Sequence, residues 1–168
     1  LYKMFNPLSS GSRNFEKKTR EWEDSQDLID LVAGCQLTGA ALEEFLFDNI
    51  DLPAVISYLA ATCLMNDNDH VSKNYYMYRD SDGDKEWMMI PWDKDLTLGR
   101  NYTITGGELN DQMFADNDPF CHPLFGDINH QKIDGGYHRL IDACYRNLRI
   151  REMYVRRLWS LMEEQLQP

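Results

Sequence analysis

The sequence predicts an α+β domain that is mainly helical and carries a central β-hairpin. Apolar residues recur at helical spacing over residues 24–65 and again over residues 140–162. Between these regions, two strand-like runs at 74–80 and 86–93 flank an Asp-Gly dipeptide, a strong signal for a hairpin turn. Since strands do not alternate with helices along the chain, a parallel β/α sheet is not expected.

The length and net charge of the chain exclude several classes of protein. The 168 residues are enough to bury one core, and the apolar runs are too short to cross a bilayer. The 17 basic residues against 28 acidic ones give a net charge of −11, so the overall field repels nucleic acid. The sequence therefore predicts one soluble domain over residues 1–168, with neither nucleic acid nor membrane as a partner.

The N-terminal part is expected to be irregular before two short helices begin. Residues 1–23 are polar, and we expect an arm or loop there. Because the chain opens with LYKMFN and not with an initiator methionine, we also expect a fragment of a longer protein. A first helix is predicted from Asp24, a suitable N-cap, until Gly34 interrupts the apolar pattern, and a second over roughly 39–49.

A third helix is predicted over residues 52–65. Asp51 is a suitable N-cap, Pro53 fits the first turn, and the segment is apolar on most sides, so this helix should be buried. It runs into NDNDHVSKN at 66–74, a polar stretch with no periodicity, and then into the predicted hairpin.

The last third is predicted to combine a long irregular excursion with two closing helices. Residues 96–136 are rich in Gly, Asn, Asp and Pro, a composition typical of functional or mobile loops. The four cysteines lack a C-x-x-C pair and are expected to be small core residues, not zinc ligands. The two expected apolar helix faces consist of Leu140, Ile141, Ala143, Cys144 and Leu148, and of Ile150, Met153, Tyr154, Leu158, Trp159, Leu161 and Met162.

The chemistry is predicted to lie where the third helix meets the hairpin. Asp69 and Asn74 have the D-x-x-x-x-N spacing of a kinase catalytic loop. In such a loop the aspartate orients or deprotonates the acceptor hydroxyl, and the asparagine binds Mg²⁺. The spacing alone occurs often by chance, and a polar turn also explains it.

The hairpin strengthens this interpretation because its pairing places residues near 74 opposite residues near 93. Asp69, Asn74 and Asp93 can then share one Mg²⁺ or Mn²⁺ ion, and Asp95 can reach the same ion from a loop. Aspartates beside buried residues need a partner, which favours metal ligands over a solvated strand end. The apolar neighbours expected to be buried are Trp92, Leu96 and Leu98.

Two longer segments, NDNDHVSKNYYMYRD at 66–80 and EWMMIPWDKDLTLGR at 86–100, resemble the signature of the CotH kinase family, the protein-kinase-like spore-coat protein H group. The likeness extends to LYKMFN and FEKKTRE near the start and to HPLFG and IREMYVRRL near the end, so it covers nearly the whole chain. A co-linear likeness of this length is more specific than either short motif. It implies a protein-kinase-like C-lobe.

The resemblance also implies an atypical kinase that uses ATP and Mg²⁺ or Mn²⁺ to phosphorylate Ser or Thr of secreted or spore-coat proteins, outside the cell or on the spore surface. In this sequence Asp69 resembles the catalytic aspartate, Asn74 a metal ligand and Asp93 the metal-binding aspartate of a DFG-like position. Asp95 takes a supporting role at the metal, and Lys73 is placed to touch phosphate.

The chain departs from a complete kinase domain in one respect. The N-terminal lobe, with its ATP-anchoring lysine and phosphate-covering loop, is expected ahead of Leu1 in the same full-length protein. Neither a G-x-G-x-x-G loop nor a Walker motif occurs in the chain. We therefore expect the chain to be inactive by itself.

Two other functions stay open. The run from Asp93 through Asp95 to Thr97 fits the D-x-D-x-T pattern of aspartyl-phosphate phosphatases, with Asp93 as nucleophile. That chemistry needs a doubly wound parallel sheet, which the sequence does not predict. The other alternative is a non-catalytic coat module that keeps a kinase-like fold for interactions.

Overall fold

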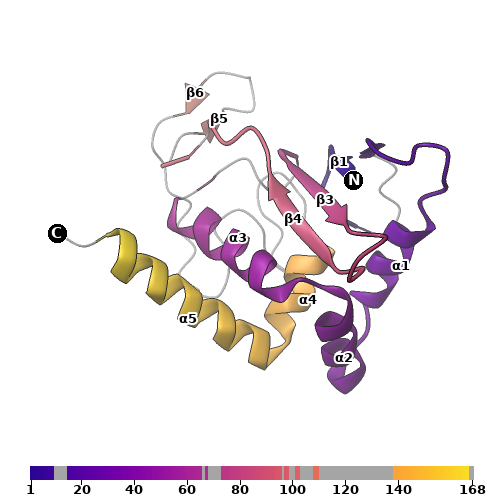
Figure 1. Ribbon diagram of the computed structural model, residues 1–168. Coiled ribbons are helices and arrows are strands. Elements are labelled where there is room, and N and C mark those ends of the chain that lie inside the picture. The colour runs from indigo at the N-terminus through magenta and orange to yellow at the C-terminus, as the bar shows by residue number, and fades with distance from the viewer. Residues whose placement is uncertain are drawn as a thin grey trace.

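The fold is α+β and mainly helical, as the sequence predicts (Figure 1). The computed structural model describes residues 1–9, 15–65, 67, 73–95, 97–98, 101–102, 108–109 and 138–166. Within these ranges the helices are α1 Gln26–Gly34, α2 Gly39–Asn49, α3 Leu52–Leu64, α4 Arg139–Arg146 and α5 Leu148–Gln165. The strands are β1 Tyr2–Met4, β2 Phe15–Lys17, β3 Tyr75–Arg79, β4 Trp87–Pro91, β5 Asn101–Tyr102 and β6 Glu108–Leu109.

The main sheet is antiparallel, with strand order β2-β1-β3-β4, while β5 pairs only with β6. The predicted hairpin is thus the β3–β4 half of a larger sheet. The expectation of an irregular arm over residues 1–23 is wrong, because β1 and β2 extend this sheet. Tyr2 and Met4 are buried while Lys3 between them is not, but an alternation over three residues is too short to predict a strand.

The Asp80 side chain stabilises the hairpin turn that connects β3 to β4. Asp80 accepts hydrogen bonds on its Oδ1 from the backbone N–H groups of Asp82, at 3.2 Å, and Gly83, at 3.1 Å. A β-carbon at Gly83 would collide with the Asp80 carboxylate, so any other residue there would displace the side chain that accepts these two hydrogen bonds. Strands β3 and β4 pair from Arg79 opposite Trp87, next to the turn, to Tyr75 opposite Pro91.

Helix α3 lies between the sheet and α5, and contacts both β4 and α5 (Figure 1). Its first turn is stabilised by Asp51, whose side chain accepts a hydrogen bond from the Ala54 N–H at 2.9 Å. Val55 and Leu59 are almost fully buried, as the apolar character of this segment predicts. The predicted cap, the proline in the first turn and the burial of the helix are all confirmed.

Two expectations for the other helices need correction. The first helix begins at Gln26 with Ser25 at the N-cap, and Asp24 lies outside it, where its Oδ1 accepts a hydrogen bond from the Gln26 N–H at 3.1 Å. In α5, Trp159 is 60% exposed and Met162 38%, and Leu148 is 61% exposed. Only the stripe with Ile150 and Tyr154 is buried in this helix, because just one face packs against α3 and α4.

Among the described residues, no helix is long and apolar enough to span a membrane. Cys35 and Cys144 are buried free thiols, in accord with the expected core role, and Cys63 is half-buried. The predicted irregular excursion at 96–136 lies largely outside the described residues.

Candidate functional site

The hairpin brings two of the predicted site residues to one end of the sheet. The ladder ends with Tyr75 opposite Pro91, and the Trp92 N–H then donates a hydrogen bond to the Asn74 carbonyl at 3.1 Å. Asp93 follows directly. The predicted pairing of residues near 74 with residues near 93 is confirmed.

Asn74 and Asp93 also share an uncommon backbone conformation. Asn74 has φ of 63° and Asp93 has φ of 53°, both in the left-handed region. Asn and Asp tolerate this region better than other residues with a β-carbon, but it still costs roughly 1 kcal/mol each. Such conformations persist where the surrounding structure fixes them, and they cluster at functional sites.

The expected burial around Asp93 is wrong. Trp92 is 49% exposed and Leu98 is 77% exposed, while Leu96 lies outside the described residues. Trp92 contacts the sheet through the edge of Tyr76, with ring centroids 5.6 Å apart, and the Lys3 Nζ lies 5.8 Å from the centre of its ring. Strand β4 is the edge strand of the described four-stranded sheet.

Asp93 and Asp95 are accordingly both exposed. Burial therefore no longer argues that they need a partner. Exposure suits a different requirement, since a hydrated metal ion and phosphate oxygens must reach these carboxylates from solvent. Asn74, in contrast, is only 8% exposed.

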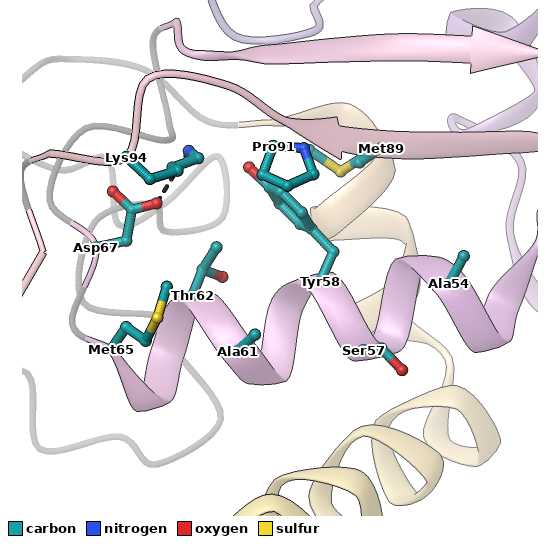
Figure 2. Close-up of a pocket in the computed structure, with 10 residues that line it drawn as sticks. All are labelled: Ala54, Ser57, Tyr58, Ala61, Thr62, Met65, Asp67, Met89, Pro91 and Lys94. Carbon is teal, nitrogen blue, oxygen red and sulfur yellow. Dashed lines mark ion pairs between the residues drawn. The ribbon is translucent and has the colours of Figure 1, made fainter.

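The buried aspartate of this region is Asp67, which the sequence analysis did not select. Its side chain is fully buried, its Oδ2 lies 2.9 Å from the Lys94 Nζ, and its backbone N–H bonds to the Thr62 carbonyl at 3.0 Å (Figure 2). Lys94 is itself only 17% exposed. A signal existed in the sequence, because Asp67 is separated from the end of an apolar helix by two residues and Lys94 lies between two aspartates.

A cavity of about 320 Å³ lies between α3 and β4 beside this ion pair (Figure 2). Its walls are largely apolar, with Met65 from the end of α3 and Met89 and Pro91 from β4. The Tyr58 ring also lines it, and the Lys94 Nζ lies 5.7 Å from the centre of that ring. Burial, with a smaller contribution from Asp67, raises the pKa of Tyr58 well above its usual value, so this phenol stays protonated.

The remaining predicted residues are only partly described. Asp69 lies outside the described residues, and Lys73 is exposed next to Asn74. Within the described ranges, no group of three or more His, Cys, Asp or Glu side chains converges on one point. The predicted metal ligands are Asn74, Asp93 and Asp95, and the neighbouring Asp69 is not described. The shared metal site therefore stays a prediction. Amide and carboxylate oxygens at one end of a hairpin are the donor type that Mg²⁺ and Mn²⁺ prefer.

One further buried polar residue packs against β3. His138, just before α4, is fully buried, and its ring lies 5.2 Å from that of Tyr75 on β3. Burial lowers the pKa of His138 to about 3, so the imidazole is neutral in the folded protein.

Comparison with known protein families matches residues 5–168 to the family described as CotH kinase protein. No match is found among curated proteins. The match covers nearly all of the sequence and includes both arms of the hairpin with the loops at its end. A match of this extent supports a kinase-like role with ATP and a divalent metal. The chain belongs to the CotH kinase family.

Proposed function

We propose that this chain carries the catalytic and metal-binding side chains of an ATP-dependent protein kinase. The reaction is transfer of the γ-phosphoryl group of ATP to Ser or Thr hydroxyls of secreted or spore-coat proteins. The observation that carries the proposal is the hydrogen bond between Trp92 and Asn74, which holds Asn74 beside Asp93 at one end of the hairpin. Family membership gives the reaction class, and this pairing supports the choice of residues.

Each residue has one role in the proposal. Asp69 orients the acceptor hydroxyl and accepts its proton. Asn74 and Asp93 hold Mg²⁺ or Mn²⁺, with Asp95 in support, and the exposed Lys73 contacts phosphate. When bound, the metal neutralises charge on the β- and γ-phosphates. The adenine and the remaining phosphates are assigned to an N-terminal lobe of the same full-length protein.

Substituting the two aspartates tests the proposal. In the full-length protein, Asp69→Asn and Asp93→Asn should each lower the rate of protein phosphorylation by about 100-fold or more, since each removes an acid–base or metal-binding group. The measurement is transfer of labelled phosphate from ATP to protein. Asp82→Asn is the matched control, because its side chain is 91% exposed at the far end of the hairpin. A rate near that of the parent for either site variant contradicts the assignment.

The same measurement separates the two alternatives. A non-catalytic coat module would give no phosphoryl transfer even in the unaltered protein. A phosphatase that uses Asp93 as nucleophile would need a doubly wound parallel sheet, but the sheet that carries this residue is antiparallel. No described feature favours that chemistry over the kinase reaction.

A further inference from the structure

The Asp67–Lys94 pair joins the two segments that carry the proposed catalytic residues. Asp67 precedes Asp69 by two residues, and Lys94 lies between Asp93 and Asp95. We propose that this ion pair is a positioning device, which holds the segment of Asp93 and Asp95 in place against Asp67 at the end of α3. This inference rests on the proposed function. It adds two positioning residues that do not themselves touch substrate or metal.

The exposure pattern of the loop after β4 supports this role. Asp93 and Asp95 face solvent, whereas Lys94 between them turns toward α3 and is 17% exposed (Figure 2). Asp93 has a left-handed φ of 53°, and Lys94 is bonded directly to both aspartates, so fixing the Lys94 side chain against Asp67 restricts the backbone from which both carboxylates project. Lys94 is therefore placed to control where both carboxylates point.

Backbone contacts hold the same loop on either side of the ion pair. At its start, the Trp92 N–H bonds to the Asn74 carbonyl at 3.1 Å. Farther along, the Leu98 N–H bonds to the Met65 carbonyl at 2.6 Å, and Leu98 has a left-handed φ of 59°. The loop is thus attached to β3 at one end and to the end of α3 at the other. The ion pair is the attachment between these two points.

The pair is better suited to fixing geometry than to stabilising the fold. Both charged atoms are shielded from solvent, and they form an ion pair without the alignment of a hydrogen bond. Burying two charges costs about as much free energy as their attraction returns, so uncharged replacements of both partners are often neutral for stability. A pair of this kind still restricts the position of the two segments. This difference between stability and position makes the role testable.

The adjoining cavity provides a way to change the cation without removing it. Lys94 and Asp67 both line the cavity of about 320 Å³ between α3 and β4. The larger guanidinium of an arginine therefore has room beside Asp67. Lys94→Arg should keep the ion pair and the position of the loop.

The test compares three variants of the full-length protein. The double variant Asp67→Asn/Lys94→Met removes both charges and should fold with a melting temperature near that of the parent. Its affinity for Mn²⁺, measured by electron paramagnetic resonance, should fall by about tenfold or more, as for other residues that orient metal ligands. Lys94→Arg should keep the affinity of the parent. The control Glu16→Gln/Lys18→Met removes an exposed ion pair of 2.6 Å and should change nothing.

The rate of phosphoryl transfer gives a second readout. The double variant should lose rate at low Mn²⁺ and recover most of it when Mn²⁺ is raised. The inference is overturned if the folded double variant binds Mn²⁺ as tightly as the parent, or if Lys94→Arg binds it as weakly as the double variant. If the parent binds Mn²⁺ and the variants do not differ from it, only the positioning role fails. A parent that neither binds Mn²⁺ nor transfers phosphate overturns the proposed function as well.

Discussion

The two sides of the loop after β4 differ in nearly every physical respect. On the α3 side, Asp67 and Lys94 are buried against Tyr58 and the apolar wall of the cavity. On the other side, Asp93 and Asp95 are exposed, and Trp92 is half-exposed. The buried side supplies fixed positions, and the exposed side supplies carboxylates that solvent ions can reach. A site that handles a metal ion and phosphate needs both properties, and here a single loop provides them.

Damage to the hydrophobic core that holds α3 under this loop should have the largest effect, because the whole domain depends on that core. Leu59→Ala in α3 should destabilise the fold by about 2–5 kcal/mol, since Leu59 is 1% exposed and the change leaves a cavity in the core. Urea denaturation followed by circular dichroism measures this loss. The control is Leu166→Ala, just beyond the end of α5, which is 60% exposed in the parent and should cost little. Equal effects of the two changes would show that the described core is wrong.

Acid should lower the free energy of unfolding, because His138 is buried in its neutral form. The pKa of His138 is lowered to about 3 in the folded protein, against 6.5 normally, so the unfolded chain binds a proton that the folded chain excludes. The contribution of this neutral histidine is complete above pH 6.5 and is lost as the pH falls toward 3. Each pH unit within that window should cost roughly 1 kcal/mol of unfolding free energy.

The comparison variant for this prediction is His138→Gln, which keeps a polar side chain but cannot titrate. Urea midpoints measured between pH 5 and 7, above the range where most carboxylates titrate, isolate the effect of the histidine. The stability of the parent should fall more steeply than that of the variant. Parallel pH dependences would mean that His138 becomes charged without cost in the folded protein.

Sequence reasoning succeeded where a local pattern determines the structure. The Asp51 cap, the apolar α3 and the β3–β4 hairpin each follow from a few neighbouring residues, and all three are present. The same hairpin pairing placed Asn74 beside the segment of Asp93. These features depend on short-range geometry, which spacing along the chain reveals.

Apart from the N-cap of α1, which is a local error of two residues, the failures depend on which parts of the chain meet or do not meet across long sequence distances. Strand β1 forms only because residues 2 and 3 pair with residues 77 and 76 of β3. Trp92 and Leu98 were expected to be buried from their apolar character alone, yet they are 49% and 77% exposed. Asp67 is buried because Lys94 returns to it from the far arm of the hairpin. Spacing along the chain shows neither these two contacts nor the exposure of Trp92 and Leu98.

A divalent metal should have the smallest effect on stability, because the ion would act only on the exposed side. At about ten times its dissociation constant, a ligand stabilises the folded state by about 1.4 kcal/mol, which corresponds to a few degrees in the melting temperature of a domain of this size. Mg²⁺ or Mn²⁺ should therefore raise the melting temperature of the chain by about 2–5 °C at low ionic strength. Added salt should reduce the shift, because Asp93 and Asp95 are exposed and their charges are screened. Asp93→Asn should abolish the shift, whereas Asp82→Asn at the opposite end of the hairpin should leave it unchanged. A shift of equal size in both variants would mean that the ion binds the acidic surface in general, and no shift in the parent would remove the case for a preformed metal site beside Asn74.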